Sequence, residues 1–231
     1  MQKILITIFL AASSAAVVAD PVSLLVYRVW EQGAEPYLSR VMVTPGHVRL
    51  DEGSDGAGYT LFDRNNERIY NVSVDDRSIL VLDSAQPLPA LPDTLVLQEQ
   101  VEADTAAPLV AGQRPNHVRL LANGELCAEL VTIESVMEEA VRGLAEMKRV
   151  LARVQAATLS SMPLDMKTPC DLAGNVYAAD RSLRFGLPLL ERATGHSQSL
   201  VDFSDSHDAD AALFTLPEGF NRRPMFAPGI F

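Results

Sequence analysis

The sequence has few of the residues that build most metal and redox sites. It contains two cysteines, four histidines and one tryptophan among 231 residues. The cysteines form no Cys-x-x-Cys motif, and no two histidines fall at the spacing of zinc ligands. The histidines are His47, His117, His196 and His207. We read them as surface or loop residues, and we assign no metal site and no cofactor.

Catalytic motifs are also missing. The sequence has no Gly-x-Ser-x-Gly elbow, no phosphate-binding loop, no dinucleotide-binding fingerprint and no His-Glu-x-x-His motif. We therefore assign no catalytic residue and expect a non-catalytic protein. A serine triad can form without a local motif, so an extracytoplasmic hydrolase stays open as a further alternative.

Two acidic segments are weak candidates for ion binding. Residues 51–56, Asp-Glu-Gly-Ser-Asp-Gly, lack the regular ligand spacing and the final glutamate of a calcium loop, so we read them as a solvated turn. Asp202, Asp205, His207, Asp208 and Asp210 form a denser patch that could bind a divalent ion weakly. A charged loop is the simpler interpretation of this patch.

The first nineteen residues have the pattern of a secretory signal peptide. Lys3 precedes an apolar run from Ile4 to Leu10, which leads to small residues and ends at Ala19 before Asp20. The run is shorter than the roughly 20 apolar residues of a membrane-spanning helix. We predict cleavage between Ala19 and Asp20, and a periplasmic location. No cysteine lies near the cut, so no lipid anchor is expected.

The charge balance is acidic, with 30 acidic and 19 basic residues and a formal net charge of −11. Such a charge repels phosphate backbones and anionic lipid surfaces. We expect no nucleic-acid partner and, after processing, no integral membrane span. The residues from 20 to 231 are enough for a single domain with a sizeable core.

Cys127 and Cys170 are the two cysteines, and an exported chain with a small, even number of cysteines usually joins them. A metal or redox role has no support from the neighbouring sequence. We predict a structural disulfide between Cys127 and Cys170.

Most of the chain after the leader reads as short strands separated by turn residues. Pro45-Gly46 and Asn123-Gly124 are strong turn signals, and Val, Leu, Ile and Tyr alternate partly with polar residues between such turns. This pattern is typical of an antiparallel sheet. The predicted strands are Val22–Glu31, Leu38–Thr44, His47–Asp51, Tyr59–Asp63, Arg68–Val74, Ser78–Leu82, Leu95–Val101, His117–Leu121, Glu125–Ile133, Leu187–Arg192 and Ser199–Phe203.

One long amphipathic helix is predicted from Ser135 to Leu159. Ser135 and Glu138 have the spacing of a capping box. The apolar stripe behind them must pack on a partner, and the sheet is the one available. The stripe consists of Met137, Val141, Leu144, Met147, Leu151, Val154 and Thr158. The fold class is therefore α+β.

The strand Ile79-Leu80-Val81-Leu82 is apolar on both faces, which implies that something covers the second face of the sheet as well. We expect the core, or the wall of an apolar cavity, to include strand and helix residues together. These residues are Val43, Leu50, Leu61, Tyr70, Val72, Leu80, Leu82, Val141, Leu144 and Leu151.

Several short segments carry a family resemblance. They are Val48–Asp51, Leu61–Arg64, Ile69–Val72, Phe185–Pro188 and Leu213–Phe220. Together they resemble a group of uncharacterised Gram-negative periplasmic proteins, similar in pattern to the LolA-type lipoprotein-sorting fold. The resemblance implies a curved antiparallel sheet that forms an unclosed half-barrel, with helices on its concave side and a cavity for acyl chains. It assigns no lipid-binding residue in this chain.

Two functions follow as expectations. The first is a non-catalytic periplasmic protein that binds a lipid or another hydrophobic ligand in a half-barrel cavity. The second is an envelope interaction or scaffold module with a filled core, whose exposed sheet edge or acidic tail recruits a protein partner. A deep apolar cavity would favour the first, and a tightly packed interior the second.

Overall fold

The computed structural model describes residues 21–83, 86–163 and 167–225. The predicted leader and its cleavage site at Ala19 and Asp20 lie outside the described residues. Within the described part of the chain, no helix is long and apolar enough to cross a membrane.

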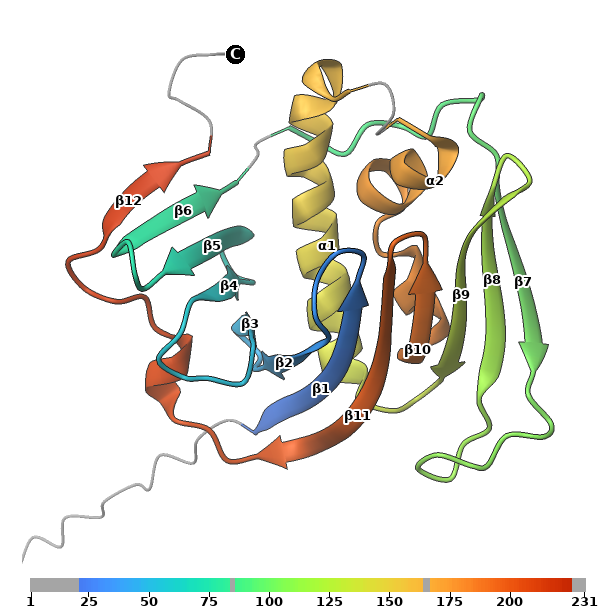
Figure 1. Cartoon of the computed structure of the whole chain (residues 1–231), viewed down its shortest axis with the longest axis horizontal. Helices are drawn as coiled ribbons and strands as arrows, with labels where there is room; N and C mark the ends of the chain where they lie inside the picture. The colour runs from blue at the N-terminus through green and yellow to red at the C-terminus, as the bar shows by residue number, and fades with distance from the viewer. Residues whose placement is uncertain (1–20, 84–85, 164–166, 226–231) are drawn as a thin grey trace, which may run out of the picture.

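The described residues build one large, unclosed sheet of twelve strands around one long helix (Figure 1). The spatial order is β12-β6-β5-β4-β3-β2-β1-β11-β10-β9-β8-β7, and β12 with β6 is the parallel pair in an otherwise antiparallel sheet. The strands are β1 (Val22–Glu31), β2 (Tyr37–Val43), β3 (His47–Asp51), β4 (Tyr59–Asp63), β5 (Arg68–Ser73), β6 (Ser78–Leu82), β7 (Leu97–Ala103), β8 (Asn116–Ala122), β9 (Glu125–Ile133), β10 (Leu187–Ala193), β11 (His196–His207) and β12 (Asn221–Pro224).

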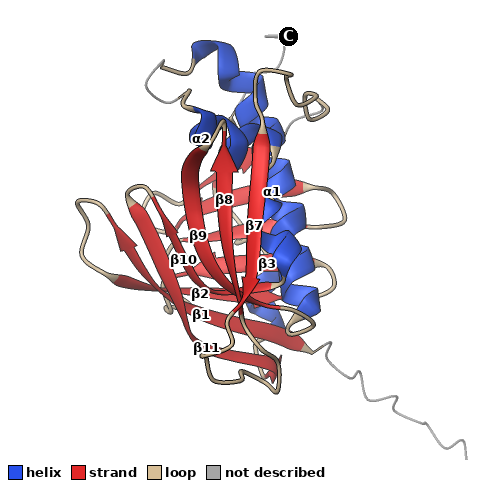
Figure 2. Ribbon diagram, turned by 90° about the vertical axis from the view of Figure 1, so that its right-hand side faces the viewer, coloured by secondary structure: helices blue, strands red, loops and turns tan. Residues whose placement is uncertain are grey.

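The sheet bends strongly around helix α1 (Glu138–Thr158). Figure 1 shows β6, β5 and β4 on one side of the helix and β9, β8 and β7 on the other, with β1 and β11 between these two wings. Figure 2 shows the β7–β9 wing turned steeply away from β1 and β2. The expected α+β class and curved antiparallel sheet are confirmed at this level.

Shorter helical turns lie between α1 and the final strands. The 3₁₀ turn η1 (Leu159–Ser161) ends the long helix, and α2 (Pro169–Leu172) continues into the π-helical turn η3 (Ala173–Tyr177). A second 3₁₀ turn, η4 (Arg181–Phe185), leads into β10, and a third, η5 (Ala211–Phe214), follows β11. The predicted disulfide is present, since Cys127 in β9 is bonded to Cys170 in α2.

Helix α1 packs on the concave face of the sheet through small and aliphatic residues. Its buried positions are Ala140, Gly143, Met147, Val150, Ala152 and Val154. The larger residues of the predicted stripe, Val141, Leu144 and Leu151, are partly buried at the margins of this contact. The small residues bring the helix axis close to the strands, because a Cβ atom on Gly143 would meet Val43 and Val48.

The start of the helix differs from the predicted capping box. The N-cap residue is Met137, and no side chain caps the helix there. Ser135 and Met137 both have left-handed backbone conformations, with φ values of 57° and 53°. This tight turn separates the serine from the first helical amides. Glu138 and Glu139 instead place two negative charges at the positive end of the helix dipole.

Arg64 fastens the helix to the sheet from the turn between β4 and β5. Its Nε lies 2.7 Å from Oε2 of Glu146, and it also pairs with Glu139. One guanidinium nitrogen donates to the carbonyl oxygen of Thr44 at 2.8 Å. The Arg64 side chain is 8% exposed, so its ion pairs link the helix to the sheet largely out of contact with water.

The second face of the sheet carries its own core, as the doubly apolar β6 strand predicted. Met42, Leu61 and Ile79 are buried there against Phe214, which belongs to the segment after β11. We call residues 209–220 the C-terminal cover. Sequence reasoning predicted that a cover exists but did not identify this segment as the cover.

The ten residues expected in one core or cavity are therefore divided between two faces. Val43, Leu50, Leu82, Val141, Leu144 and Leu151 belong to the helix side. Leu61, Tyr70 and Val72 belong to the side beneath the C-terminal cover. Leu80 belongs to neither core and is 39% exposed, because the helix-side core reaches Leu82 on the same strand but does not extend to Leu80.

Candidate functional site

An apolar hollow lies in the bend of the sheet, between α1 and the central strands. We call it the central hollow, and its volume is about 290 Å³. This value lies just below the usual range of ligand-binding pockets, which begins at about 300 Å³. Its apolar wall consists of Tyr27, Val41, Leu50, Leu144, Met147, Leu183 and Pro188. Leu50 and Leu144 are thus the two predicted cavity residues that do line it.

Polar side chains complete the wall of the central hollow. Glu191 on β10 accepts a hydrogen bond of 2.9 Å from Nε2 of Gln198 on β11. Nδ1 of His196, at the start of β11, lies 3.7 Å from Oε1 of Glu31, at the end of β1. Lys148 and Ser39 are the remaining polar residues of the wall. A few polar groups around an apolar interior are the usual composition of a small-molecule site.

Tyr27 forms a neutral part of this wall. Its ring is buried, and its hydroxyl donates a hydrogen bond of 3.1 Å to the carbonyl oxygen of Pro188. Burial raises the pKa of Tyr27 well above its usual value, and the nearby charge of Glu191 raises it further. The hydroxyl therefore stays protonated and serves as a hydrogen-bond donor within the protein.

Two further hollows adjoin the central one along α1. The disulfide-side hollow, about 290 Å³, is bounded by Cys127 and Cys170 and shares Lys148 and Glu191 with the central hollow. The arginine-lined hollow, about 420 Å³, lies near the start of α1 and shares Leu183 with the central hollow. The shared residues make the three hollows neighbours on the side of α1 that faces η4.

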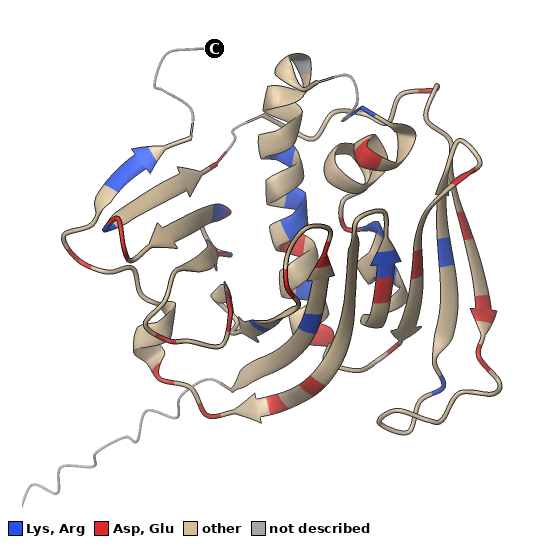
Figure 3. Ribbon diagram, in the orientation of Figure 1, with Lys and Arg blue, Asp and Glu red and all other residues tan. Residues whose placement is uncertain are grey.

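The arginines of the arginine-lined hollow are paired with nearby acidic residues. Arg149 and Arg184 both bond to Asp180, at 2.9 and 3.1 Å, and Arg142 pairs with Glu139. Burial alone would raise the pKa of Asp180, but the hydrogen bonds from these two arginines lower it below its usual value. Figure 3 shows how basic residues gather along α1, while acidic residues dominate β7 and β11.

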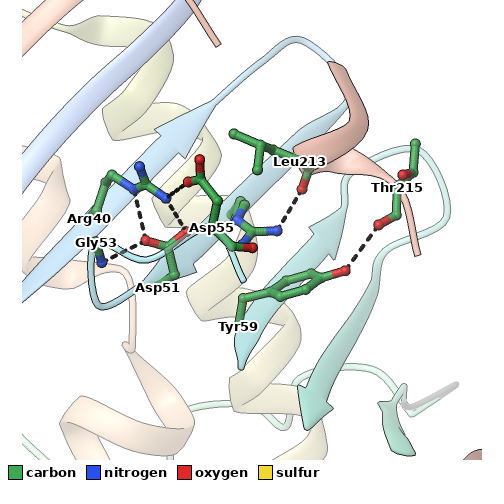
Figure 4. Close-up of polar contacts among 8 residues, drawn as sticks. Arg40, Asp51, Gly53, Asp55, Tyr59, Leu213 and Thr215 are labelled. Atoms are coloured by element: carbon green, nitrogen blue, oxygen red, sulfur yellow. Dashed lines mark hydrogen bonds and ion pairs between the residues drawn. The ribbon is translucent and has the colours of Figure 1, made fainter. Parts of the chain in front are cut away.

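A second polar cluster is buried on the opposite face of the sheet (Figure 4). Asp51 accepts hydrogen bonds from Arg40 and from Nε of Arg49, each at 2.8 Å, and from the amide of Gly53 at 2.9 Å. The side chains of Arg49 and Asp51 are 2% and 0% exposed. The expected solvated turn over residues 51–56 is wrong for Asp51, because the two arginines compensate its burial.

This cluster holds the C-terminal cover in place. Nη1 of Arg49 donates to the carbonyl oxygen of Leu213 at 2.8 Å, and its guanidinium carbon lies 3.7 Å from the centre of the Tyr59 ring. The Tyr59 hydroxyl donates to the carbonyl oxygen of Thr215 at 3.0 Å. We read the cluster as a fastener between sheet and cover, since each of its polar groups is engaged by the protein itself.

The four histidines lie at or near the ends of strands, with His117 exposed and His47, His196 and His207 partly buried. His117 lies 2.8 Å from Asp104 and is 55% exposed. In the patch, Asp202 and Asp210 accept hydrogen bonds from nearby backbone amides. Among the residues that the structure describes, no group of three or more histidine, cysteine, aspartate or glutamate side chains could hold a metal ion.

Sequence reasoning missed Lys148 and Glu191, the two charged residues that line both the central and the disulfide-side hollow. They lie far apart in the sequence, on a helix and a strand, and belong to no motif. The sequence offered one signal that could have singled out Lys148: the other basic residues of its helix are all arginines.

Comparisons with known proteins give distant structural neighbours. No family model matches the chain, and no curated protein matches it. An uncharacterized conserved protein from Thermus thermophilus has a TM-score of 0.44 and 12% identity, covering 89% of this chain and 90% of that one. PNGF-II has a TM-score of 0.40 and 7% identity, covering 88% of this chain but 32% of its own length.

Proposed function

We propose that this protein is a non-catalytic periplasmic protein that binds one hydrophobic chain in the central hollow. The observation that carries the proposal is the apolar wall beneath α1, where Leu50, Leu144 and Met147 line a space that the described side chains leave open. An apolar surface of this kind favours an apolar ligand over water. The scaffold alternative expects a filled core, so the open space under α1 makes it the less favoured interpretation.

The compartment belongs to the same proposal. The leader pattern of Met1–Ala19 supports export, and the bond between Cys127 and Cys170 suits an oxidising environment. The LolA-type resemblance of the sequence also supports the proposal, because an unclosed antiparallel sheet around a helix is the arrangement that this resemblance implies. An acyl chain is accordingly the first ligand to test.

The direct test is displacement of a dansyl-labelled fatty acid, together with native mass spectrometry of the protein purified from periplasm. Leu144→Trp adds a bulky ring to the wall of the central hollow, and we expect it to weaken probe binding about tenfold or more. Leu80→Trp is the matched control, because Leu80 is exposed on β6. Equal probe binding by both variants, or no binding by the wild type, would contradict the proposal.

The interaction module is the second candidate, and the edge strand β7 favours it. Six of its seven residues are exposed, and Val101 is 49% exposed. The opposite edge, β12, is short, contains Arg222 and Arg223 and ends at Pro224, which are features that discourage strand pairing. β7 has no proline and no lysine, so it can accept an added strand from an envelope protein.

Photocrosslinking in intact cells tests this second candidate. A photoreactive residue in place of Gln100 on β7 should yield one reproducible adduct, while the same residue in place of Arg222 on β12 should not. Adducts of the same kind from both edges, or from neither, would contradict pairing at β7.

A further inference from the structure

We propose that the central hollow recognises a single-chain amphiphile with a zwitterionic head group, whose anionic part pairs with Lys148 and whose cationic part faces Glu191. This inference rests on the proposed function, because it assumes that an apolar chain enters the hollow. It adds the chemistry of the head group, which the apolar wall does not specify.

Lys148 is the residue on which the inference depends. It stands on α1 with its side chain half-buried, and it lines both the central and the disulfide-side hollow. Within the described residues, no carboxylate lies within 4 Å of its amine and no hydrogen bond engages it. An ammonium without a partner in the protein is available to an anion that a ligand brings, and such a charge-assisted pair is among the stronger polar contacts.

The other charged residues around these two hollows have partners within the protein. Arg181 donates to the carbonyl oxygens of Gln98 and Leu121, at 2.6 and 2.8 Å. The Thr168 hydroxyl donates to Oδ2 of Asp171 at 2.5 Å, and His196 lies near Glu31. Among the described residues that line these hollows, Lys148 is thus the cation left free to bind a ligand.

Glu191 determines which kind of anion fits. In the described part of the chain, only one of its carboxylate oxygens, Oε2, has a hydrogen bond, and the donor is Gln198. Glu191 lines the same two hollows as Lys148 without forming an ion pair with it. The negative charge of Glu191 would therefore repel a purely anionic head group. A head group with both signs of charge satisfies both residues.

The test uses four ligands with the same twelve-carbon chain, titrated by calorimetry below their micellar concentrations. They are dodecanol, dodecanoate, dodecylammonium and dodecylphosphoethanolamine. We expect the zwitterion to bind about tenfold more tightly than dodecanol, because a hydrogen bond to a charged group is stronger than one between neutral groups. Dodecanoate and dodecylammonium should each bind less tightly than the zwitterion.

Three variants assign the preference to residues. Lys148→Met should reduce the affinity for the zwitterion to about that for dodecanol. Glu191→Gln should remove the preference for the zwitterion over dodecanoate. Lys167→Met is the matched control, because it removes the same charge from a lysine that lines neither hollow, and it should leave the preference unchanged.

The outcomes distinguish failure of the head-group inference from failure of the proposed function. If all four ligands bind equally and Lys148→Met changes nothing, the head-group inference is overturned while chain binding stands. If dodecanoate binds most tightly, the role of Glu191 is overturned. If none of the four binds, both the proposed function and this inference fail.

Discussion

Gly143 of α1 lies so close to Val43 of β2 that a Cβ atom on the glycine would stand 2.9 Å from Cγ1 of Val43. The same atom would stand 3.0 Å from Cγ2 of Val48. Both valines are completely buried and stiff at χ1, so neither can move aside easily. The missing side chain of Gly143 therefore sets the distance between helix and sheet.

We expect Gly143→Ala to destabilise the protein by roughly 1–2 kcal/mol. The cost of overpacking, roughly 1–3 kcal/mol, exceeds the gain in helix propensity, which is up to about 1 kcal/mol. Urea unfolding measures the difference. Gly174→Ala in η3 is the control, since a Cβ atom there has no neighbour within 4 Å. Equal stability of the two variants would show that the helix and sheet can separate without cost.

Arg49→Met should destabilise the protein by about 3 kcal/mol, because it leaves the fully buried carboxylate of Asp51 with Arg40 as its remaining arginine. It also releases the carbonyl oxygen of Leu213, so amide exchange should quicken in residues 209–220. Arg68→Met removes an exposed pair with Asp83 and should cost less than about 1 kcal/mol. Unchanged exchange in the C-terminal cover would contradict the fastening role.

Asp51 should also contribute to acid unfolding. Burial alone would raise the pKa of Asp51, but hydrogen bonds from Arg40, Arg49 and the Gly53 amide lower it below its usual value. A carboxyl group with a lower pKa in the folded state adds stability that is complete above about pH 4, near the unfolded pKa. That stability is lost as the pH falls through the lower folded pKa.

The measurement is the free energy of unfolding of wild type and Asp51→Asn from pH 3 to pH 7. The difference between them should be largest at pH 7 and should shrink below about pH 4. Asp180, whose pKa is also lowered, leaves some acid sensitivity in the variant. A difference that stays constant across the whole range would refute the assignment to Asp51.

Loss of the disulfide should lower stability by roughly 2–4 kcal/mol, the usual range for such bonds. The bond closes a 43-residue separation and ties α2 to β9. The double variant Cys127→Ala/Cys170→Ala should match the reduced wild type in thermal unfolding. A reduced wild type as stable as the oxidised one would mean that the contacts of α2 suffice without the bond.

Strand positions were predictable because turn chemistry is local. The strands β1, β3, β4, β6 and β9 have the predicted bounds. Asn123 and Gly124, with φ values of 52° and 81°, form a tight turn, because asparagine and glycine tolerate positive φ better than other residues. In such places the residue types that fix the turn are neighbours in the sequence.

Features that depend on distant contacts were not predictable. β12 carries two arginines and no apolar alternation, and it forms because β6 offers a free edge. Ser135 takes a left-handed conformation instead of capping the helix. The site depends in the same way on tertiary contacts: Leu50 and Leu144 were expected from their apolar character, whereas Lys148 and Glu191 meet only in the folded protein.

The middle of the sheet joins β1, the first strand, to β11, one of the last. A nascent chain therefore has no partner for one edge of its first strand until nearly all of the polypeptide has been synthesised. Contacts between such distant segments slow folding, because a long loop must close before they form. Until that loop closes, the open edge of β1 is exposed to strands of other chains, and such pairing is a known route to the aggregation of β-sheet proteins.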